Sequence, residues 1–307
     1  MNNSISVVIP VYKCENSIAE LYERLKNTLE RISTNWEIVF VNDASPHNDW
    51  EQIKKLINID KRVKGINLSR NFGQHNAIFA GLEHAKGEWI VVMDGDLQDK
   101  PEDIIALYHE AEKGFEIVVA SRAIRYDNYF KKLSSKIFYQ VLSYLSETKI
   151  DYTIGNFGIY HRKVINSVLQ MGDKIKFFPV MVHWVGFSKQ KVNVEHDERK
   201  YGKTSYSFKS LLKLAINVIL SFSDKPLRLI MKFGLLITLF SILFLFYNTY
   251  RYLSGEILAM GWTSLILSIW FFSGLIIFLI GMVGLYVGKT FENSKNRPNY
   301  IIKDKIL

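Results

Sequence analysis

Short apolar runs alternate with helical patterns over the first two thirds of the chain. Five runs rich in β-branched residues have the continuous apolarity of buried parallel strands. They cover residues 5–10, 37–41, 65–68, 89–93 and 116–120. Between them, apolar residues recur at helical spacing over residues 18–32 and 76–85, and Pro101 stands where a third helix would begin. This alternation predicts an α/β fold with an open, mostly parallel, Rossmann-like sheet over residues 1–205.

Two long uncharged runs follow in the last third of the chain. Residues 233–250 and 262–288 contain 18 and 27 residues without a charge. As helices they would be about 27 and about 40 Å long, against a hydrocarbon core of about 30 Å. Basic residues flank the pair on both outer sides: Lys225, Arg228 and Lys232 before it, and Lys289, Lys295, Arg297, Lys303 and Lys305 after it. The pattern predicts a two-helix transmembrane hairpin with both ends in the cytoplasm; two buried helices of a soluble domain are the alternative.

Two other stretches, residues 208–222 and 130–145, combine lysines with apolar and aromatic side chains. Such helices usually cover a protein core, but a basic, aromatic helix just before a membrane hairpin is also typical of the lipid interface. We favour the interfacial interpretation for 208–222, and both interpretations stay open for 130–145.

Composition narrows the classes of partner and site. The chain has 307 residues, 48% of them hydrophobic, and a formal net charge of +9. A single cysteine excludes an internal disulfide framework and multi-cysteine metal sites, and no two histidines have the spacing of a zincin site. The basic residues cluster around the apolar runs and no recognition motif is present, so we expect an anionic membrane face as the partner, not nucleic acid.

The strongest chemical signal follows the fourth apolar run. Asp94 and Asp96 stand on alternate residues after this strand, with Gln98 and Asp99 behind them. In open α/β sheets, ligands bind beyond the carboxyl ends of strands. Hard oxygen ligands at such a place suit Mg²⁺ or Mn²⁺ held together with a substrate diphosphate. A solvated acidic turn is the alternative, because Asp-x-Asp alone is common.

Three more polar clusters have similar positions. Asn42 and Asp43 follow a strand and could bind a nucleobase or ribose, although such residues are also common in turns. Arg70 precedes a predicted helix start, where anions are favoured. Arg199 and Lys203 belong to a basic loop that could hold a phosphate or contact anionic lipid.

Several strings in this order carry a family resemblance: Ile-Pro-Val-Tyr (9–12), Val-Asn-Asp-Ala-Ser (41–45), Leu-Ser-Arg-Asn-Phe-Gly (68–73), Met-Asp-Gly-Asp-Leu-Gln-Asp (93–99) and Glu-Arg-x-x-Gly-x-Thr (198–204). They resemble family 2 glycosyltransferases of the polyprenyl-phosphate type, which include dolichol-phosphate mannose synthases, bactoprenol glucosyltransferases and undecaprenyl-phosphate aminoarabinose transferases. Lys-Pro-Leu-Arg (225–228) before the first uncharged run, and Gly-Leu-Tyr-Val-Gly-Lys (284–289) with Asn-Arg-Pro-Asn-Tyr (296–300) around the end of the second, extend the resemblance to essentially the whole chain.

The resemblance implies a GT-A fold at the cytoplasmic face that takes a sugar from a nucleotide donor. The implied nucleotide-binding residues are Pro10, Tyr12, Glu15, Asn42, Asp43 and Arg70. The implied catalytic residues are Asp94, Asp96, Arg122 and Arg199, with Asp94, Asp96 and Gln98 at the metal ion. The implied contacts to acceptor or sugar are Gln98, Asp99, Asn156 and Lys203.

Two departures from the family pattern bear on the chemistry. Lys13 and Cys14 stand where the family often has Asn-Glu, which weakens a role for Glu15. Asn156 stands where many members have an aspartate that could act as a base. A phosphate acceptor is largely ionised near pH 7, because its second pKa is about 6, and needs no base. Asn156 therefore favours a phosphate acceptor over a sugar hydroxyl.

These observations together predict an inverting, metal-dependent glycosyltransferase of the plasma membrane that moves a sugar from a nucleotide-sugar, more readily a UDP-sugar, to a polyprenyl phosphate such as undecaprenyl phosphate. The alternatives are transfer to a saccharide hydroxyl, a nucleotidyltransferase and a non-catalytic membrane scaffold. The predicted parts are a catalytic domain (1–205), a juxtamembrane helix (206–228), a hairpin (229–290, with helices over 229–252 and 262–288) and a cytoplasmic tail (291–307). The sugar, the base, the choice of metal and a homo-oligomeric state stay open.

Overall fold

The computed structural model describes residues 4–122, 144–145, 154–194, 219, 223, 225–254 and 261–307. The chain divides into two compact units. The first contains Met1–Ser143, Thr148–Leu211 and Arg297–Leu307, and the second contains Tyr144–Glu147 and Leu212–Asn296. Residues Arg297–Leu307 thus belong to the same unit as the N-terminal residues. The predicted tail over 291–307 was drawn as a separate part of the chain.

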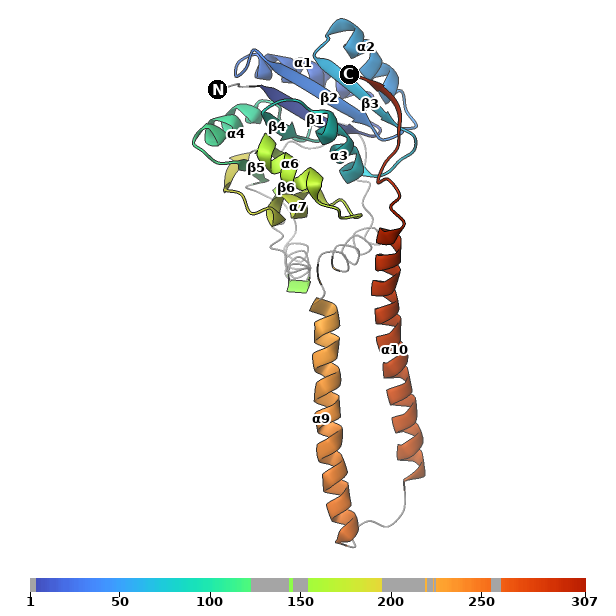
Figure 1. The fold of residues 1–307 in the computed structure, drawn as a ribbon. Coiled ribbons are helices and arrows are strands. Elements are labelled where there is room, and N and C mark those ends of the chain that lie inside the picture. Colours follow the sequence, from blue (N-terminus) through green and yellow to red (C-terminus); the bar gives the residue numbers. More distant parts are fainter. Residues whose placement is uncertain are drawn as a thin grey trace. The chain divides into compact units, whose positions relative to one another are not determined.

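The first unit is built on a sheet of eight strands in the order β7-β5-β6-β4-β1-β2-β3-β8 (Figure 1). The strands are β1 (Ile5–Val11), β2 (Trp36–Asn42), β3 (Val63–Leu68), β4 (Trp89–Val92), β5 (Ile117–Arg122), β6 (Ile154–His161), β7 (Lys189–Val194) and β8 (Ile302–Ile306). Four neighbouring pairs are parallel, whereas β6 and β8 run antiparallel to their neighbours. The predicted α/β class is confirmed, with a mixed sheet.

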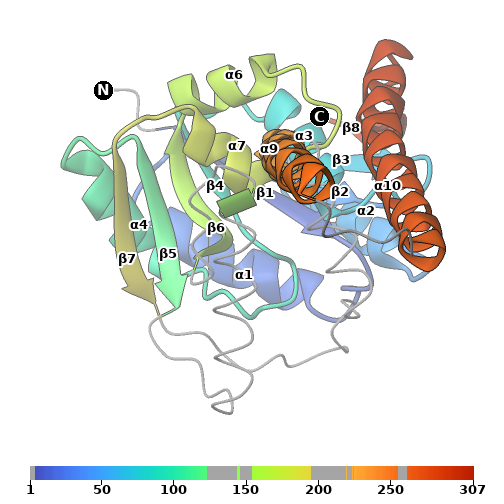
Figure 2. The same ribbon diagram turned by 90° about the horizontal axis from the view of Figure 1, so that it is seen from below.

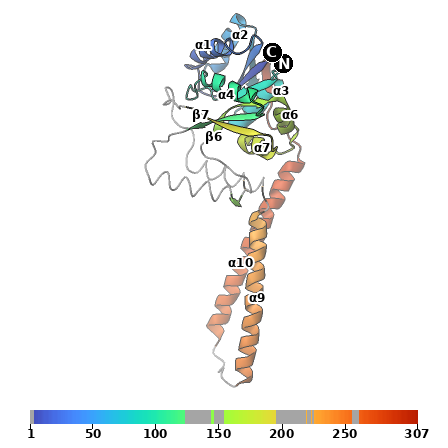
Figure 3. The ribbon, with the colours of Figure 1, turned by 90° about the vertical axis from the view of Figure 1, so that its left-hand side faces the viewer.

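Helices cover both faces of this sheet (Figures 2 and 3). They are α1 (Ile18–Leu29), α2 (Asp49–Ile59), α3 (Gln74–His84), α4 (Asp103–Glu112), α6 (Arg162–Gln170) and α7 (Phe178–Trp184). Side chains of α1, α2 and α4 join one face of the central strands in a single apolar core. On the other face, α3 packs so closely on β1 that a Cβ atom at Gly81 would lie 2.3 Å from a methyl group of Val8.

The strands form where continuous apolar runs can be buried on both sides. Every residue of β1 is buried, as expected for a central parallel strand with helices on both faces. The outermost strands are different, because β7 carries Lys189 and Lys191 and β8 carries Lys303 and Lys305. Lysines on edge strands oppose pairing with a further strand.

The second unit contains two long helices, α9 (Lys225–Leu253) and α10 (Trp262–Ser294). Each extends beyond its predicted range: α9 begins earlier, at Lys225, and α10 continues through a polar last turn to Ser294. Lys295, just after α10, forms an ion pair with Glu292 of this last turn. Among the described residues, one stretch, Ser268–Ser294, is long and apolar enough to cross a membrane. The helices predicted here are therefore present, but a membrane crossing by α9 or α10 stays a prediction. The stretches 130–145 and 208–222 lie almost entirely outside the described residues.

A buried charge network lies near the amino ends of β1, β2 and β3. Glu37 on β2 forms an ion pair with Lys64 on β3, and both side chains are nearly buried. The Glu37 carboxylate also accepts hydrogen bonds from Ser6 Oγ at 2.6 Å and from the backbone N–H of Lys86. Burial alone raises the pKa of Glu37, but these hydrogen bonds outweigh it and lower the pKa below its ordinary value of 4.5.

Replacing Lys64 by methionine is expected to destabilise the protein by about 3 kcal/mol, because it leaves the nearly buried Glu37 carboxylate without the cation that balances its charge. Thermal unfolding in detergent measures this loss. In the wild type, the ionised Glu37 carboxylate adds to the free energy of unfolding above pH 4.5. This contribution is lost as the pH falls through the lowered pKa of Glu37 in the folded protein. Lys303→Met on β8 is the control, since Lys303 is exposed. Equal melting temperatures for both variants would contradict the role of the pair.

Candidate active site

The site residues predicted from the sequence gather at one edge of the sheet. In the pairing register, Val11 of β1 lies beside Asn42 of β2, which lies beside Asn67 of β3. The carboxyl ends of these strands therefore meet, and the loops that follow them carry Tyr12, Asp43 and Arg70. The carboxyl end of β4 reaches the same edge, since β4 is parallel to β1. This is the edge at which open α/β sheets bind their ligands.

Asp43 connects the loop after β2 to the start of α3. Its Oδ1 accepts the backbone N–H of Phe72 at 2.7 Å, and its Oδ2 accepts that of Gly73 at 2.9 Å. Gly73 has a φ of 92°, in the left-handed region that favours glycine. Burial raises the pKa of Asp43, while the two N–H donors and the nearby Arg70 act in the opposite direction. Both oxygens of this carboxylate are thus used to hold the beginning of α3.

Gln74, the first residue of α3, is a site residue that the sequence reasoning missed. Its Nε2 donates a hydrogen bond to Asp94 Oδ1 at 2.6 Å. Its position in the sequence could have indicated this, because Gln74 directly follows the Leu-Ser-Arg-Asn-Phe-Gly string. Hydrogen-bond partners of this kind orient the carboxylates that bind metal ions in proteins, and Gln74 has this position at Asp94, which is predicted to bind one.

The loop after β4 has a tight turn of its own. The backbone N–H of Gln98 donates to Asp96 Oδ1 at 3.2 Å, and Leu97 has a φ of 63° although it is not a glycine. Asp94, Asp96 and Gln98 are half-buried, whereas Asp99 is buried. Asp94 and Asp96 are thus the partly accessible carboxylates of this loop.

The end of β1 packs against the same loop. A Cβ atom at Gly95 would lie 3.3 Å from the carbonyl oxygen of Pro10 and 3.6 Å from Cys14 Sγ. Ser17 Oγ bonds to the carbonyl oxygen of Gly95 at 2.6 Å. Burial raises the pKa of Cys14 to about 11, so its thiol is protonated at neutral pH and is a poor nucleophile.

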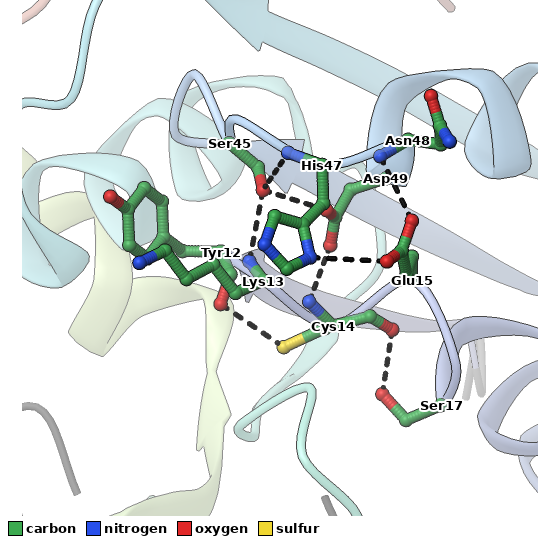
Figure 4. A network of polar contacts seen from close by, with 9 residues as sticks. All are labelled: Tyr12, Lys13, Cys14, Glu15, Ser17, Ser45, His47, Asn48 and Asp49. Atoms are coloured by element: carbon green, nitrogen blue, oxygen red, sulfur yellow. Dashed lines mark hydrogen bonds and ion pairs between the residues drawn. The ribbon is translucent and has the colours of Figure 1, made fainter. Parts of the chain in front are cut away.

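Hydrogen bonds connect the loops after β1 and β2 (Figure 4). Asp49, fully buried, accepts the N–H of Cys14 at 2.6 Å and the hydroxyl of Ser45 at 2.7 Å. Glu15 bonds to the imidazole of His47 at 3.1 Å and accepts the N–H of Asn48 at 3.1 Å. The carboxylate of Glu15, predicted to bind nucleotide, is therefore engaged within the protein. Its side chain supports the start of α2.

The remaining predicted residues have different surroundings. Tyr12 is 39% exposed and lies beside the amine of Lys13. The guanidinium of Arg70 stacks on the ring of Phe72 at 4.4 Å. Asn156 lies on β6, near the strand end that meets the carboxyl ends of β4 and β5. Arg122 ends β5 at this edge, and Arg199 and Lys203 lie outside the described residues.

The residues at this edge fit a divalent metal ion that is shared with a substrate. Among the described residues, no group of three or more His, Cys, Asp or Glu side chains is arranged to hold a metal ion. Mg²⁺ needs no such group, since it keeps several waters and binds through one or two carboxylates together with substrate phosphates. Asp94 and Asp96 provide two carboxylates of this kind.

A comparison with protein families decides the classification. The model of glycosyl transferase family 2 matches residues 6–169. The chain belongs to this family. The matched residues include the loops after β1 to β4 that form the edge described above, so this glycosyltransferase carries its family signature where the structure gathers its polar side chains.

Relatives resemble this glycosyltransferase over nearly its whole length. It is 38% identical over 299 residues to the uncharacterized glycosyltransferase YkcC of Bacillus subtilis (strain 168), covering 97% of this chain and 93% of the relative. It is 32% identical over 308 residues to the undecaprenyl-phosphate 4-deoxy-4-formamido-L-arabinose transferase of Proteus mirabilis (strain HI4320), covering 98% and 93%.

Solved structures share the fold. The glucosyl-3-phosphoglycerate synthase of Mycobacterium tuberculosis, solved with uridine diphosphate, superimposes with a TM-score of 0.51 at 12% sequence identity. The match covers 73% of this chain and 80% of that chain. The predicted GT-A-like fold of the glycosyltransferase is therefore confirmed.

Replacing Gln74 by methionine removes the hydrogen bond to Asp94 and keeps the length of the side chain. We expect the Mn²⁺ concentration that half-saturates UDP binding to rise about tenfold, as is typical when a partner of a metal ligand is lost. Calorimetry on the purified protein in detergent measures this. Gln52→Met on α2 is the control, and an unchanged Mn²⁺ requirement in Gln74→Met would show that Gln74 does not orient Asp94.

Proposed function

We propose that this family 2 glycosyltransferase moves a sugar from a nucleotide-sugar, a UDP-sugar in the first instance, to a polyprenyl phosphate, with inversion at the anomeric carbon. The observation that carries the proposal is the pair Asp94 and Asp96 at the carboxyl end of β4, beside the loops of β1, β2 and β3. The kinship with an undecaprenyl-phosphate sugar transferase over 98% of the chain supports the lipid acceptor.

The reaction is a single displacement. An oxygen of the acceptor phosphate forms a bond to the anomeric carbon as the bond from that carbon to the donor diphosphate breaks, which releases the nucleoside diphosphate. A bound Mg²⁺ or Mn²⁺ would neutralise charge on the diphosphate. Asp94 and Asp96, with Gln98 beside them, would hold this ion, and Gln74 orients Asp94 for the task.

The acceptor requires positioning more than deprotonation. A phosphate monoester has its second pKa near 6, so its attacking oxygen is largely ionised at pH 7. Asn156 is consistent with this, because an amide cannot act as a general base. Arg122, Arg199 and Lys203 are our candidates for holding the phosphates of the donor and acceptor, and Asp99 and Asn156 for shaping the acceptor side. Holding the reactants in line can lower the barrier of such reactions by about 7–11 kcal/mol.

The chain path supports a membrane hairpin. Strand β8 comes after α10 and pairs with β3 in the catalytic sheet. If α10 alone crossed the bilayer, β8 would be on the side opposite to β3. A second crossing by α9 restores β8 to the catalytic side, and the lysines and arginines that flank α9 and α10 favour the cytoplasm for that side. We therefore propose a plasma-membrane protein with two spans and a cytoplasmic catalytic unit.

Asp94→Asn and Asp96→Asn are each expected to lower kcat at least about 100-fold, because they weaken the binding of the ion that balances the charge of the leaving diphosphate. Purified protein is incubated with undecaprenyl phosphate, Mn²⁺ and a panel of nucleotide-sugars, and the released nucleoside diphosphate and the mass of the lipid product are recorded. Glu51→Gln, on the exposed side of α2, is the control. Wild-type turnover in both aspartate variants would refute the metal site, and product formed only with a saccharide acceptor would refute the lipid acceptor.

The hairpin is tested by labelling. Cys14→Ser removes the one cysteine of the chain, and Ser254→Cys or Asn293→Cys then introduces a single exposed thiol at the far end of α9 or near the end of α10. An impermeant maleimide is expected to label position 254 in right-side-out vesicles and position 293 only in inverted ones. Labelling of both positions from the same side would contradict two crossings.

A further inference from the structure

The C-terminal strand contributes a polar side chain to a row that ends in the candidate donor site. Asn42 of β2, Asn67 of β3 and Asp304 of β8 are direct neighbours in the pairing register. Asn42 and Asn67 are buried, and Asp304 is exposed. Strand β8, which carries Asp304 at the edge of the sheet, is the dark red strand beside β3 in Figure 1. Residues from two consecutive strands and from β8, which is far from both in the sequence, thus form one line at this edge of the sheet.

Hydrogen bonds run along this line in one direction. Asn67 Nδ2 donates to Asp304 Oδ2 at 3.0 Å, and Asn42 Nδ2 donates to Asn67 Oδ1 at 2.9 Å. Asn42 Oδ1 then accepts the backbone N–H of Ser45 at 3.2 Å. Each amide of the line uses its nitrogen toward β8 and its oxygen toward the site.

The carboxylate of Asp304 sets this direction. An ionised carboxylate can only accept hydrogen bonds, so Asn67 must present its nitrogen to Asp304 and its oxygen to Asn42. Asn42 must then present its nitrogen to Asn67, which leaves its oxygen for Ser45. With the opposite orientation, Asn42 would place an amide N–H against the N–H of Ser45, and that bond would be lost.

The bond from Ser45 to Asn42 shapes the loop that carries the predicted nucleotide-binding residue Asp43. Within this loop Ala44 has a φ of 48°, a left-handed conformation that a non-glycine residue holds only when its surroundings impose it. Ser45 also accepts the N–H of Lys13 at 3.0 Å, which connects the loop to the end of β1. A change in the orientation of Asn42 would therefore reach both loops.

Other contacts hold the C-terminal segment in place. The N–H of Ser69 donates to the carbonyl oxygen of Ile301 at 2.9 Å, and Tyr300 donates its hydroxyl hydrogen to Glu83 on α3. Lys174 donates to the carbonyl oxygen of Arg297 at 2.9 Å. The segment is thus attached to the loop after β3, to α3 and to the chain before α7.

We infer that Asp304 is a positioning residue for the donor nucleotide: through Asn67 it orients the amide of Asn42 and so maintains the loop over residues 42–45. The inference rests on the proposed function, which assigns the donor nucleotide to that loop. It follows that the donor site is complete only after the chain beyond α10 has added β8 to the sheet.

Asp304→Ala is expected to raise the KM for the nucleotide-sugar and the Kd for UDP with Mn²⁺ about fivefold, because the row loses the acceptor that fixes its direction. The kcat and the KM for undecaprenyl phosphate should stay within about twofold of the wild type, since the loop binds the donor. Lys305→Ala is the matched control, because successive side chains of β8 point to opposite faces. An equal effect of Lys305→Ala would overturn the inference, as would unchanged donor binding in Asp304→Ala.

An exchange of the two side chains separates positioning from general destabilisation. Asn67→Asp alone places two carboxylates against each other and should weaken UDP binding at least as much as Asp304→Ala. The double variant Asn67→Asp/Asp304→Asn restores a single carboxylate that accepts from both neighbouring amides, so Asn42 recovers its orientation. UDP binding should return to within about twofold of the wild type. Failure of the double variant to recover, with a wild-type melting temperature, would overturn the inference.

The wild-type protein distinguishes the two proposals. If it binds UDP with Mn²⁺ but forms no lipid-linked sugar, the proposed reaction fails while the effect of Asp304 on UDP binding is still measured. The same measurements with GDP follow if UDP does not bind. Wild-type protein that binds neither nucleotide overturns both proposals.

Discussion

The arrangement of the site depends on the buried carboxylate of Asp43. It accepts the N–H groups of Phe72 and Gly73 and so ties the loop after β2 to the two residues that precede α3. A carboxylate at the start of a helix is stabilised by the partial positive charge there, which offsets part of the cost of its burial. Because α3 begins at Gln74, the same contact determines where Gln74 meets Asp94. One interaction thus relates the predicted nucleotide loop to the predicted metal loop.

The loops at this edge have strained backbones that their hydrogen bonds maintain. Lys13, Ala44 and Leu97 all have positive φ angles without being glycines, and each lies in the loop that follows a strand. Such conformations cost on the order of 1 kcal/mol each and persist where the surroundings impose them. Here Ser45 and Asp49 bind the loops after β1 and β2, and Asp96 accepts the N–H that closes the turn at Leu97. Rigid loops of this kind lose little entropy when a ligand binds.

The parallel part of the sheet could be predicted from the sequence because its strands are buried on both faces and therefore apolar throughout. Strand β8 could not, since Lys303, Asp304 and Lys305 lie exposed on the edge of the sheet and show no apolar run. It is a strand because β3 offers it a row of backbone hydrogen bonds and Asn67 offers a side-chain partner. Residue types predicted which loops would meet at one edge of the sheet, but not the contacts within them: the carboxylate of Glu15 and the amide of Asn42 bond to protein groups. Such contacts depend on loops that meet only in the folded chain.

The path of the chain has a consequence for how this glycosyltransferase folds. Its catalytic sheet is incomplete until the residues after α10 return to pair with β3. The strand β8 that completes this sheet follows α10 in the chain, and its contacts span more than two hundred residues of sequence, as the bond between Asn67 and Asp304 illustrates. Contacts of such long range form late and slowly, because the chain between them must first be ordered. We therefore expect the loop over residues 42–45 to acquire its full set of hydrogen bonds only after α10 has been synthesised and β8 has paired with β3.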